Sequence, residues 1–279
     1  MKDLHNLIEL KIGTPCKSVV LTGEEDQGKY AIPHRHSYFE FVWCLDNHGS
    51  QVIDFQKYEN KKGRIFALTP GQVHETAPDC GRTNMLIFST DFVDKRYRKQ
   101  ALLDKFFSIQ ANRSPYIDTT DDAYPYLDAQ FQLIHEETNR EKPNWDLIES
   151  LTISFLFYVA RYSTLDDVVR NQRDSRVSEL LSLIEDNYKT QKRCDFYSNK
   201  LSLTNKRINE LTRAAMGKTV TTLIHERIIL EANRDLIFTT KSVKNIALEL
   251  GFSDPSYFGR FYANHTGYSP LSLRNATFK

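Results

Sequence analysis

One unit near the C-terminal end of the chain occurs twice, fifty residues apart. The first copy runs from Thr204 to Gly217 and the second from Asp254 to Gly267. Each copy opens on a polar residue, places apolar residues three positions apart, carries basic residues among them and closes on a glycine. This is the pattern of a short amphipathic helix with a defined start and end. The repeat therefore predicts that the C-terminal part of the chain holds the same helical unit twice.

The two predicted helices have the form of DNA recognition helices, in which an apolar face packs on a scaffold helix and a polar face points outward. The residues expected to face inward are Ile208, Leu211 and Ala215 in the first copy and Phe258, Phe261 and Tyr262 in the second. The residues expected to face DNA are Asn205, Lys206, Arg207, Asn209, Glu210, Arg213, Ser256, Tyr257, Arg260 and Asn264. Two such helices on one rigid body can enter successive segments of the major groove, roughly 34 Å apart.

Side-chain chemistry divides the outward residues into two roles. Lys and Arg hydrogen-bond the edge of guanine and Asn that of adenine, so we expect Lys206, Asn209 and Arg260 to read bases. Basic residues that contact phosphates set the register of a protein on DNA without reading its sequence. The residues expected in this second role are Arg207, Arg213, Lys218 and Lys244.

Charge is unevenly distributed along the chain. The 279 residues include 37 basic and 36 acidic ones, a net charge of +1. Residues 176–279 hold 16 of the basic and 10 of the acidic residues, so the rest of the chain is acidic. A basic C-terminal part joined to an acidic N-terminal part suits a DNA-binding domain with a separate sensing domain. The length is typical of two domains.

The cysteines and the apolar runs indicate the cellular location of the protein. The four cysteines are scattered without a CxxC pair, which argues against a zinc finger or a disulfide framework and favours buried thiols. The N-terminal residues lack the apolar core of a signal peptide. The longest apolar run, residues 151–160, is half of the roughly 20 residues that a membrane span needs. We therefore expect a soluble, cytoplasmic protein with no membrane partner.

The N-terminal part has the pattern of short strands. Apolar or alternating segments occur at 18–21, 39–45, 50–55, 64–68 and 85–89, with Gly, Pro, Asn or Asp between them. Closely spaced strands of this kind predict a small antiparallel barrel or sandwich.

Near residue 121 the apolar period changes to that of helices. One helix is predicted around residues 126–134 and a second at about 144–162. The second is apolar on more than one side, so it is either enclosed within a domain or also contacts a partner chain. The predicted organisation is a sensing domain at 1–120, a helical dimerisation segment at 121–163, a linker at 164–176 and a DNA-binding domain at 177–279.

From residue 177 onward the pattern is helical, and the apolar residues Val177, Leu180, Leu181 and Ile184 predict a first helix. Two helix-turn-helix units are predicted, at 195–215 and 243–265, with a long helix at 220–238 between them. Gly251 is expected to end a helix with a positive φ. Asp254 is expected to cap the helix that begins at Pro255.

Residues 246–270, IALELGFSDPSYFGRFYANHTGYSP, closely resemble the signature of the AraC/XylS family of transcriptional regulators. The resemblance covers residues 177–275. The first copy departs from the family's usual pattern, since Thr212 and Arg213 stand where an aromatic residue and a lysine are common. The resemblance implies a regulator that binds specific DNA sequences, contacts RNA polymerase, forms homodimers, and holds a small effector such as a sugar in an N-terminal barrel.

A second resemblance, to the cupin barrels, covers residues 28–74. Its first motif runs from Gly28 through His34 and His36 to Glu40; its second runs from Gly63 to His74, with the proline displaced by one position and no asparagine four residues after the histidine. In metal-binding cupins the matching residues, His34, His36, Glu40 and His74, hold a divalent ion. Alternate residues on a strand share a face, and imidazoles with a carboxylate suit Zn, Fe, Mn or Ni.

The same residues admit another interpretation, in which no cofactor is required. The histidines then hydrogen-bond within the rim of the barrel or contact the effector directly, and Tyr38 and Trp43 stack on a sugar or fill the core. The predicted effector-binding residues are His34, His36, Tyr38, Glu40, Trp43 and His74.

The leading hypothesis is a ligand-responsive regulator, expected to be an activator and not an enzyme. Effector binding would shift the population toward the dimer geometry that fits the promoter. The alternative is a metal-dependent cupin enzyme with an appended helical domain, although no catalytic acid–base pair is visible beyond the candidate metal ligands. A purely architectural DNA-binding protein would leave the N-terminal barrel unexplained. The expected fold is α+β: a cupin-like antiparallel β-barrel with flanking helices, then an all-α domain with two helix-turn-helix units.

Overall fold

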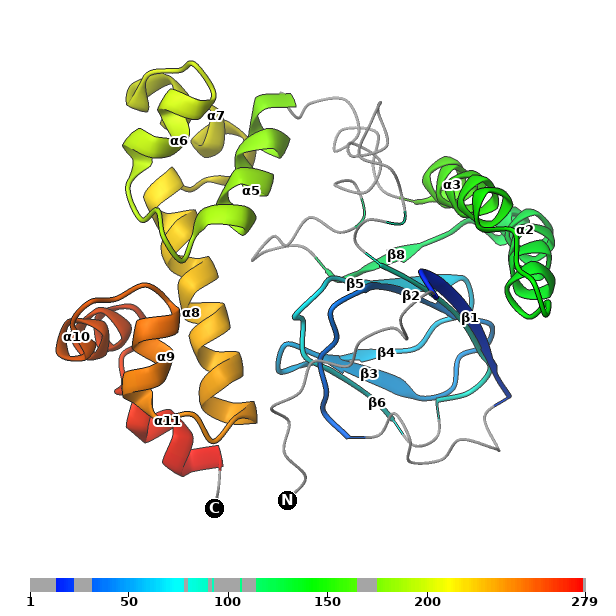
Figure 1. Ribbon diagram of the computed structural model, residues 1–279, viewed down its shortest axis with the longest axis horizontal. Coiled ribbons are helices and arrows are strands. Elements are labelled where there is room, and N and C mark those ends of the chain that lie inside the picture. Colours follow the sequence, from blue (N-terminus) through cyan, green and yellow to red (C-terminus); the bar gives the residue numbers. More distant parts are fainter. Residues whose placement is uncertain are drawn as a thin grey trace. The chain divides into compact units, whose positions relative to one another are not determined.

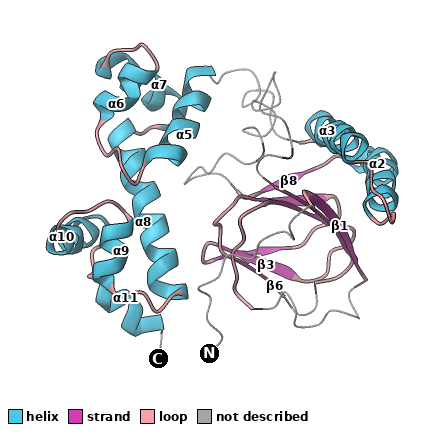
Figure 2. Ribbon diagram, in the orientation of Figure 1, coloured by secondary structure: helices cyan, strands magenta, loops and turns pink. Residues whose placement is uncertain are grey.

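The computed structural model describes residues 14–22, 32–77, 80–89, 92, 106, 114–164 and 175–277. The chain divides into two compact units (Figure 1). The described residues up to 164 belong to the N-terminal unit, and residues 175–277 belong to the C-terminal unit. Within the described ranges, strands occur in the N-terminal unit and the C-terminal unit is helical (Figure 2).

The N-terminal unit contains two antiparallel sheets, so the predicted fold class is confirmed. The larger sheet has the strand order β1-β7-β2-β5-β8 and the smaller has the order β4-β3-β6. The strands are β1 (Cys16–Leu21), β2 (Phe39–Cys44), β3 (Ser50–Ile53), β4 (Gln56–Glu59), β5 (Arg64–Leu68), β6 (His74–Thr76), β7 (Thr83–Phe88) and β8 (Tyr116–Asp118). A bridge between His34 and His74 joins the segment before β2 to β6 of the smaller sheet.

The sequence does not predict β4, β6 or β8. Strands β6 and β8 have three residues each, too few for an apolar alternation to show, and β4 is a mostly exposed edge strand. Strand β3 ends two residues earlier than predicted because Asp54 (φ 45°) and Phe55 (φ 73°) adopt left-handed conformations. Positive φ at two adjacent residues is the geometry of a tight hairpin turn, and it leads directly into β4.

Helices α2 (Tyr124–Thr138) and α3 (Trp145–Tyr162), preceded by a 3-10 turn η1 (Asp121–Ala123), share one apolar core with the larger sheet. On α3, Ile148, Leu156 and Val159 are buried in this core, whereas Leu147 and Phe157 are exposed. The helix is therefore enclosed on one face and open to solvent on another. Residues 121–163 are part of the N-terminal unit, and their role in dimerisation stays a prediction.

The C-terminal unit contains the predicted helices and one more. They are α5 (Ser175–Asn187), α6 (Cys194–Lys200), α7 (Asn205–Met216), α8 (Val220–Phe238), α9 (Val243–Glu249), α10 (Pro255–Thr266) and α11 (Pro270–Thr277). The predicted helix ends are confirmed: the Ser256 N–H donates to the Asp254 carboxylate at 2.8 Å, and Gly251 has a φ of 74°.

The repeat extends beyond the two recognition helices. Helices α7 and α10 begin fifty residues apart, and so do α8 and α11. The last two also have matching caps: Thr219 accepts from the Thr222 N–H at 3.2 Å, and Ser269 accepts from the Ser272 N–H at 3.1 Å. Helices α6 and α9 begin 49 residues apart because the turn before α10 has one more residue, Ser253. Helix α11, which the sequence analysis did not identify, is thus the copy of the first turns of α8.

Helix α8 packs on both copies. It contacts α5, α7, α9 and α11, and its fully buried apolar residues lie four apart: Val220, Ile224, Ile228, Ala232 and Leu236. Residues four apart advance about 40° around a helix, so this stripe winds by roughly 160° along its length. The start and the end of α8 therefore bury different sides, and one helix completes the apolar cores of both copies.

Helix α8 also buries an arginine. Arg227 donates to both carboxylate oxygens of Glu185 on α5, each at 2.7 Å, and to Glu231 at 3.0 Å, and its guanidinium lies 4.2 Å from the centre of the Tyr188 ring. Burial alone lowers the pKa of Arg227, but the two carboxylates outweigh it and hold the pKa above its ordinary value. The ion pair therefore fixes α5 to the middle of α8.

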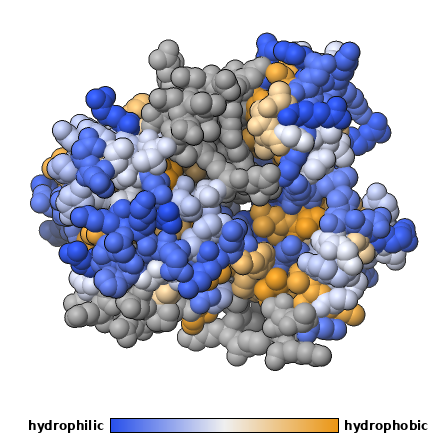
Figure 3. Space-filling view, turned by 180° about the vertical axis from the view of Figure 1, so that it is seen from behind, coloured by the Kyte–Doolittle hydropathy of each residue, from blue (hydrophilic) through white to orange (hydrophobic). Residues whose placement is uncertain are grey.

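No helix in the described ranges is long and apolar enough to cross a membrane. Seen from behind, much of the described surface is hydrophilic, and apolar side chains gather in patches (Figure 3). Large apolar residues exposed to solvent include Phe157 on α3, Tyr257 on α10 and Leu271 on α11.

The turn before α10 packs on the loop between α5 and α6. The Lys192 ammonium donates to the Lys189 carbonyl at 2.6 Å and to the Gly251 carbonyl at 3.0 Å, and it lies 4.7 Å from the centre of the Phe252 ring. A Cβ added at Gly251 would lie 1.9 Å from the Lys189 carbonyl oxygen. This position therefore requires glycine both for its positive φ and for the close approach of a second backbone.

We expect Gly251→Ala to destabilise the C-terminal unit far more than Gly217→Ala. Each alanine would take a positive φ, which costs about 1–2 kcal/mol. At Gly217 (φ 70°) nothing lies within 4 Å of the added Cβ, so that cost stands alone, whereas at Gly251 the backbone must also move. Urea unfolding of the full chain measures the loss, and hydrogen exchange of α9 and α10 locates it. Equal losses in the two variants would contradict the role of the Lys189 contact.

Candidate functional site

The residues predicted to face DNA all lie on α7 and α10. Nine of the ten are exposed, and Asn209 is half-buried. The prediction that Ala215 faces inward is wrong: it is exposed, and Thr212 is fully buried in its place. The repeat explains the difference. After a shift of fifty residues, Thr212 is equivalent to the buried Tyr262, and Ala215 is equivalent to the exposed His265.

On α7 the outward side chains are held in weak surface contacts. Arg207 pairs with Glu210 one turn on at 3.3 Å, and the Asn205 amide donates to Asp195 of α6 at 2.6 Å. Exposed pairs of this kind contribute about 0–1 kcal/mol, so a phosphate or a base can replace them. Lys206 and Arg213 are exposed on the same helix.

The side chains of two residues predicted to contact DNA instead bond to other residues of the C-terminal unit. Asn209 accepts from the Val220 N–H at 3.0 Å and donates to the Asn205 carbonyl at 2.8 Å, so its amide ties α7 to the start of α8. Lys218 pairs with Glu226 of α8 at 2.7 Å. The geometry therefore does not support Asn209 as a base-reading residue or Lys218 as a phosphate contact, and neither enters the proposal below.

Helix α10 presents its predicted outward residues on one exposed face. Phe258, Phe261 and Tyr262 are buried and anchor the helix, while Arg260 and Asn264 lie on the exposed side. The Asp254 cap and Pro255 set the start of the helix.

In the N-terminal unit, three of the predicted metal ligands come together. His36, Glu40 and His74 are all buried, and one ligand atom from each lies within 4.8 Å of the others. His36 Nε2 lies 2.9 Å, and His74 Nε2 3.8 Å, from the same oxygen of Glu40. His34 lies beside them, its ring centre 4.1 Å from that of His74, but it is only half-buried and its Nδ1 donates to the Ile32 carbonyl at 2.9 Å.

The segment before β2 and strand β6 position this cluster. His34 and His74 exchange backbone hydrogen bonds of 2.9 Å each way, and the Gly71 N–H donates to the His36 carbonyl at 2.8 Å. The pKa of His74 is well below its ordinary value, first because burial penalises the charged imidazolium and then because two other histidines are near. The surroundings of His74 therefore favour its neutral form.

Of the two aromatic residues predicted to meet the effector, only one lies at the cluster. The Tyr38 ring stacks on that of His36, with 4.0 Å between ring centres. Trp43 packs in the apolar core with α2 and α3, and its ring centre lies 5.6 Å from that of Tyr124. Alternate residues of a strand face opposite sides, so Trp43 points away from Glu40 on β2. This parity was available from the sequence, and the geometry does not place Trp43 beside the cluster. Gly28 lies outside the described residues.

The smaller sheet adds polar side chains to the face that bears His74. In the register of β3 and β6, Ile53 pairs with His74 and Gln51 with Thr76, so the four side chains share a face. Gln51 is fully buried and accepts from the Thr76 hydroxyl at 2.8 Å, while its amide nitrogen has no hydrogen-bond partner among the described residues.

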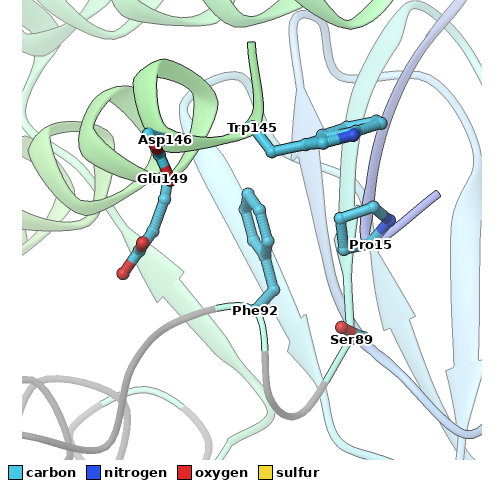
Figure 4. Close-up of a pocket in the computed structure, with 6 residues that line it drawn as sticks. All are labelled: Pro15, Ser89, Phe92, Trp145, Asp146 and Glu149. Carbon is cyan, nitrogen blue, oxygen red and sulfur yellow. The ribbon is translucent and has the colours of Figure 1, made fainter. Parts of the chain in front are cut away.

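A separate pocket of about 250 Å³ lies at the start of α3 (Figure 4). The residues that line it are Pro15, Ser89, Phe92, Trp145, Asp146 and Glu149. Its walls are apolar rings, with two carboxylates contributed by the first turns of α3. None of the predicted effector residues lines it, so it is distinct from the His36, Glu40 and His74 cluster.

Comparisons with known proteins match both units. The family model of the AraC-like ligand binding domain matches residues 17–154, and that of a helix-turn-helix domain matches residues 197–276. The chain is similar to the HTH-type transcriptional activator RhaS of Escherichia coli O6:H1, with 24% identity over 247 residues that cover 86% of each chain.

Among solved structures, the chain is similar to ToxT from Vibrio cholerae, at 15% identity over 95% of this chain and 98% of that one, with a TM-score of 0.46. It is also similar to an AraC-type transcriptional regulator from Chromobacterium violaceum, at 24% identity over 37% of this chain and 92% of that one, with a TM-score of 0.34.

We expect Lys206→Ala and Arg260→Ala each to weaken binding to a specific DNA site by about 1–3 kcal/mol, a factor of roughly 5 to 150. Each removes an exposed cation from one recognition helix. Lys57→Ala on β4 removes the same charge from an exposed position on the N-terminal unit and should leave the affinity unchanged. Fluorescence anisotropy at one fixed salt concentration gives the three dissociation constants. A loss for Lys57→Ala as large as for the other two would mean that only overall charge matters.

Proposed function

The chain belongs to the AraC/XylS family of transcriptional regulators, and we propose that it activates transcription from promoters to which α7 and α10 direct it, in response to a small polar effector. The observation that carries the proposal is the pair of matched helices, fifty residues apart, that both contact the single helix α8. Each helix has a buried anchor side and an exposed polar side with at least one basic residue.

The DNA-binding residues in this proposal are the exposed side chains of the two helices. They are Asn205, Lys206, Arg207, Glu210 and Arg213 on α7 and Ser256, Tyr257, Arg260 and Asn264 on α10. Lys206 and Arg260 suit guanine edges, and the exposed Lys244 on α9 suits a phosphate. Because α8 holds both helices, we expect a bipartite site that spans about two major-groove segments.

The effector is proposed to lie among the buried polar groups of the N-terminal unit. One carboxylate oxygen of Glu40, both ring nitrogens of His74 and the Gln51 amide nitrogen have no hydrogen-bond partner among the described residues. Unpaired buried groups cost about 1–3 kcal/mol each, and the hydroxyl groups of a sugar or a related metabolite would supply their missing partners. Tyr38, stacked on His36, offers an aromatic face beside them.

A homodimer is proposed through α2 and α3. Leu133 on α2 and Leu147 and Phe157 on α3 are large, apolar and exposed. Next to them, Tyr126 stacks on Tyr158 and Tyr162 of α3, with 5.8 and 5.2 Å between ring centres. Rigid aromatic and aliphatic side chains of this kind are typical of buried contacts between chains.

The proposed mechanism is a population shift. The effector binds more tightly to the dimer geometry that matches the promoter, and the shift is limited by its difference in affinity for the two geometries. The bound dimer would then recruit RNA polymerase. Since a regulator of this family must reach DNA, we propose a cytoplasmic location.

The test of the DNA-binding proposal is a selection from genomic DNA. The full chain is mixed with sheared DNA from its source, and the retained fragments are sequenced against a salt-matched control. We expect enrichment of a bipartite site, and the adjacent genes would indicate the effector. The double variant Lys206→Ala with Arg260→Ala should lose the enrichment. Equal recovery of all sequences by the wild-type chain, with and without metabolite extract, would contradict the proposal.

The dimer proposal predicts that Phe157→Asp shifts the chain toward monomer. The charge would have to be buried at the contact, whereas in the monomer it remains in water. Leu271→Asp on α11 changes an equally exposed apolar residue outside the proposed interface and is the control. Light scattering over a concentration series gives the mass of each variant. A wild-type chain that is monomeric at every concentration would exclude this interface.

A further inference from the structure

We propose that His36, Glu40 and His74 form a binding site for one divalent transition-metal ion inside the N-terminal unit. The site shares Glu40 and His74 with the proposed effector site, and it goes beyond that proposal because the ion would hold these two side chains and leave a position for an oxygen of the effector. It does not depend on DNA binding. The site would use His36 Nε2, His74 Nε2 and the Glu40 carboxylate.

The spacing of these atoms suits a common ion. Nitrogen and oxygen ligands lie about 2.0–2.2 Å from Zn²⁺, so two ligands at tetrahedral or octahedral angles are about 2.8–3.6 Å apart. His36 Nε2 and His74 Nε2 lie 2.9 and 3.8 Å from the same Glu40 oxygen. Small side-chain rotations would bring this arrangement into the coordination range.

The hydrogen bonding of His36 leaves its Nε2 as an electron-pair donor. Nδ1 lies 2.8 Å from the Tyr38 carbonyl oxygen, which can only accept, so Nδ1 carries a proton. In the neutral ring, Nε2 then has a lone pair, and it lies 2.9 Å from a carboxylate oxygen without forming a hydrogen bond. Two electron-pair donors this close in a buried site require a cation between them, either a proton or a metal ion. The bond to Tyr38 is the kind of outer contact that orients metal-bound histidines.

His74 favours the metal ion. Both of its ring nitrogens are buried without a hydrogen-bond partner among the described residues, and so is the second oxygen of Glu40. A proton shared between His36 and Glu40 would leave these atoms unsatisfied, whereas an ion would engage His74 and the carboxylate together.

The donor set defines the class of ion. Two imidazoles and one carboxylate suit Zn, Fe, Mn or Ni, whereas Ca²⁺ and Mg²⁺ prefer oxygen ligands alone. Three protein ligands leave at least one position for water or an oxygen of a bound molecule. We assign three ligands and not the four of the sequence prediction, because His36, Glu40 and His74 bring ligand atoms within 4.8 Å of one another and His34 is not part of that group.

The experiment uses the full chain, freed of metal with a chelator and titrated with Co²⁺. We expect one Co²⁺ per chain, visible absorption bands from an ion with nitrogen and oxygen ligands, and displacement by Zn²⁺. Glu40→Gln keeps the side-chain size but removes the charge, and we expect it to weaken binding at least about 100-fold, more than loss of an outer contact does. His74→Ala removes a different ligand and should have a similar effect.

Two controls separate this site from other histidines. His48→Ala removes an exposed histidine of the same unit, and His265→Ala disrupts the His225–His265 pair of the C-terminal unit, whose ring nitrogens lie 2.9 Å apart. Both variants should bind Co²⁺ like the wild type. Circular dichroism identifies any variant that fails to fold.

The outcomes are separable. A folded wild-type chain that binds neither Co²⁺ nor Zn²⁺ would overturn the proposal and favour a buried imidazolium–carboxylate pair, as would unchanged binding by folded Glu40→Gln. Loss of Co²⁺ binding only in His265→Ala would place the ion in the C-terminal unit. DNA retention, measured on the same preparations, tests the regulator function independently of metal binding.

Discussion

The C-terminal unit depends on a charge that α8 buries. Arg227 is taken out of water at the middle of the helix, and it is tolerated there because Glu185 from α5 and Glu231 from α8 itself neutralise it. Removing one partner of such a pair typically costs about 3–5 kcal/mol, since the remaining charge is left unpaired in the interior. The ion pairs thereby fix the position of α5 against α8. Helices α7, α9 and α11, which also contact α8, are placed relative to this pair.

The two copies reach the same backbone geometry with different interior chemistry. In the second copy, Tyr262 is buried against the aromatic core and its hydroxyl donates to Asn233 of α8 at 2.5 Å. In the first copy the equivalent residue is Thr212, which is too small to reach α8 in that way, and the Asn209 amide makes the link to α8 instead. The departure from the family pattern at Thr212 therefore accompanies a polar contact between α7 and α8 in place of an aromatic one.

Much of the fold could be predicted from the sequence because its signals are local and periodic. The positions of α7, α8 and α10, the cap at Asp254 and the positive φ of Gly251 follow from apolar spacing and from backbone preferences, which require no knowledge of neighbours. Strands β4, β6 and β8 could not be predicted in this way, since such short segments become strands only when a partner strand lies beside them.

For the candidate sites, the sequence predicted what depends on local periodicity better than what depends on contacts between distant residues. Exposure on a helix follows from its period, so nine of the ten predicted DNA-facing residues are exposed. Which polar residue is engaged by a neighbour does not follow from the period. The sequence assigned Asn209 to DNA, whereas in the structure its side chain accepts from an N–H eleven residues further along the chain. The approach of His36 and Glu40 to His74 depends on a bridge between distant segments, and only the resemblance to cupin motifs, not the spacing of residues, pointed to it.

The cysteines give the chain a natural attachment point for a chemical label. Alkylating reagents attack the thiolate, so a buried thiol with a raised pKa resists them. Burial raises the pKa of Cys16 and of Cys44 to about 12, and Cys80 is also buried. Burial raises the pKa of Cys194 as well, but this thiol is only half-buried, at the first turn of α6, with its sulfur 3.6 Å from the Asn209 amide of α7. A fluorophore coupled to the folded chain under mild conditions would therefore concentrate at Cys194, beside the first recognition helix, without any engineered cysteine.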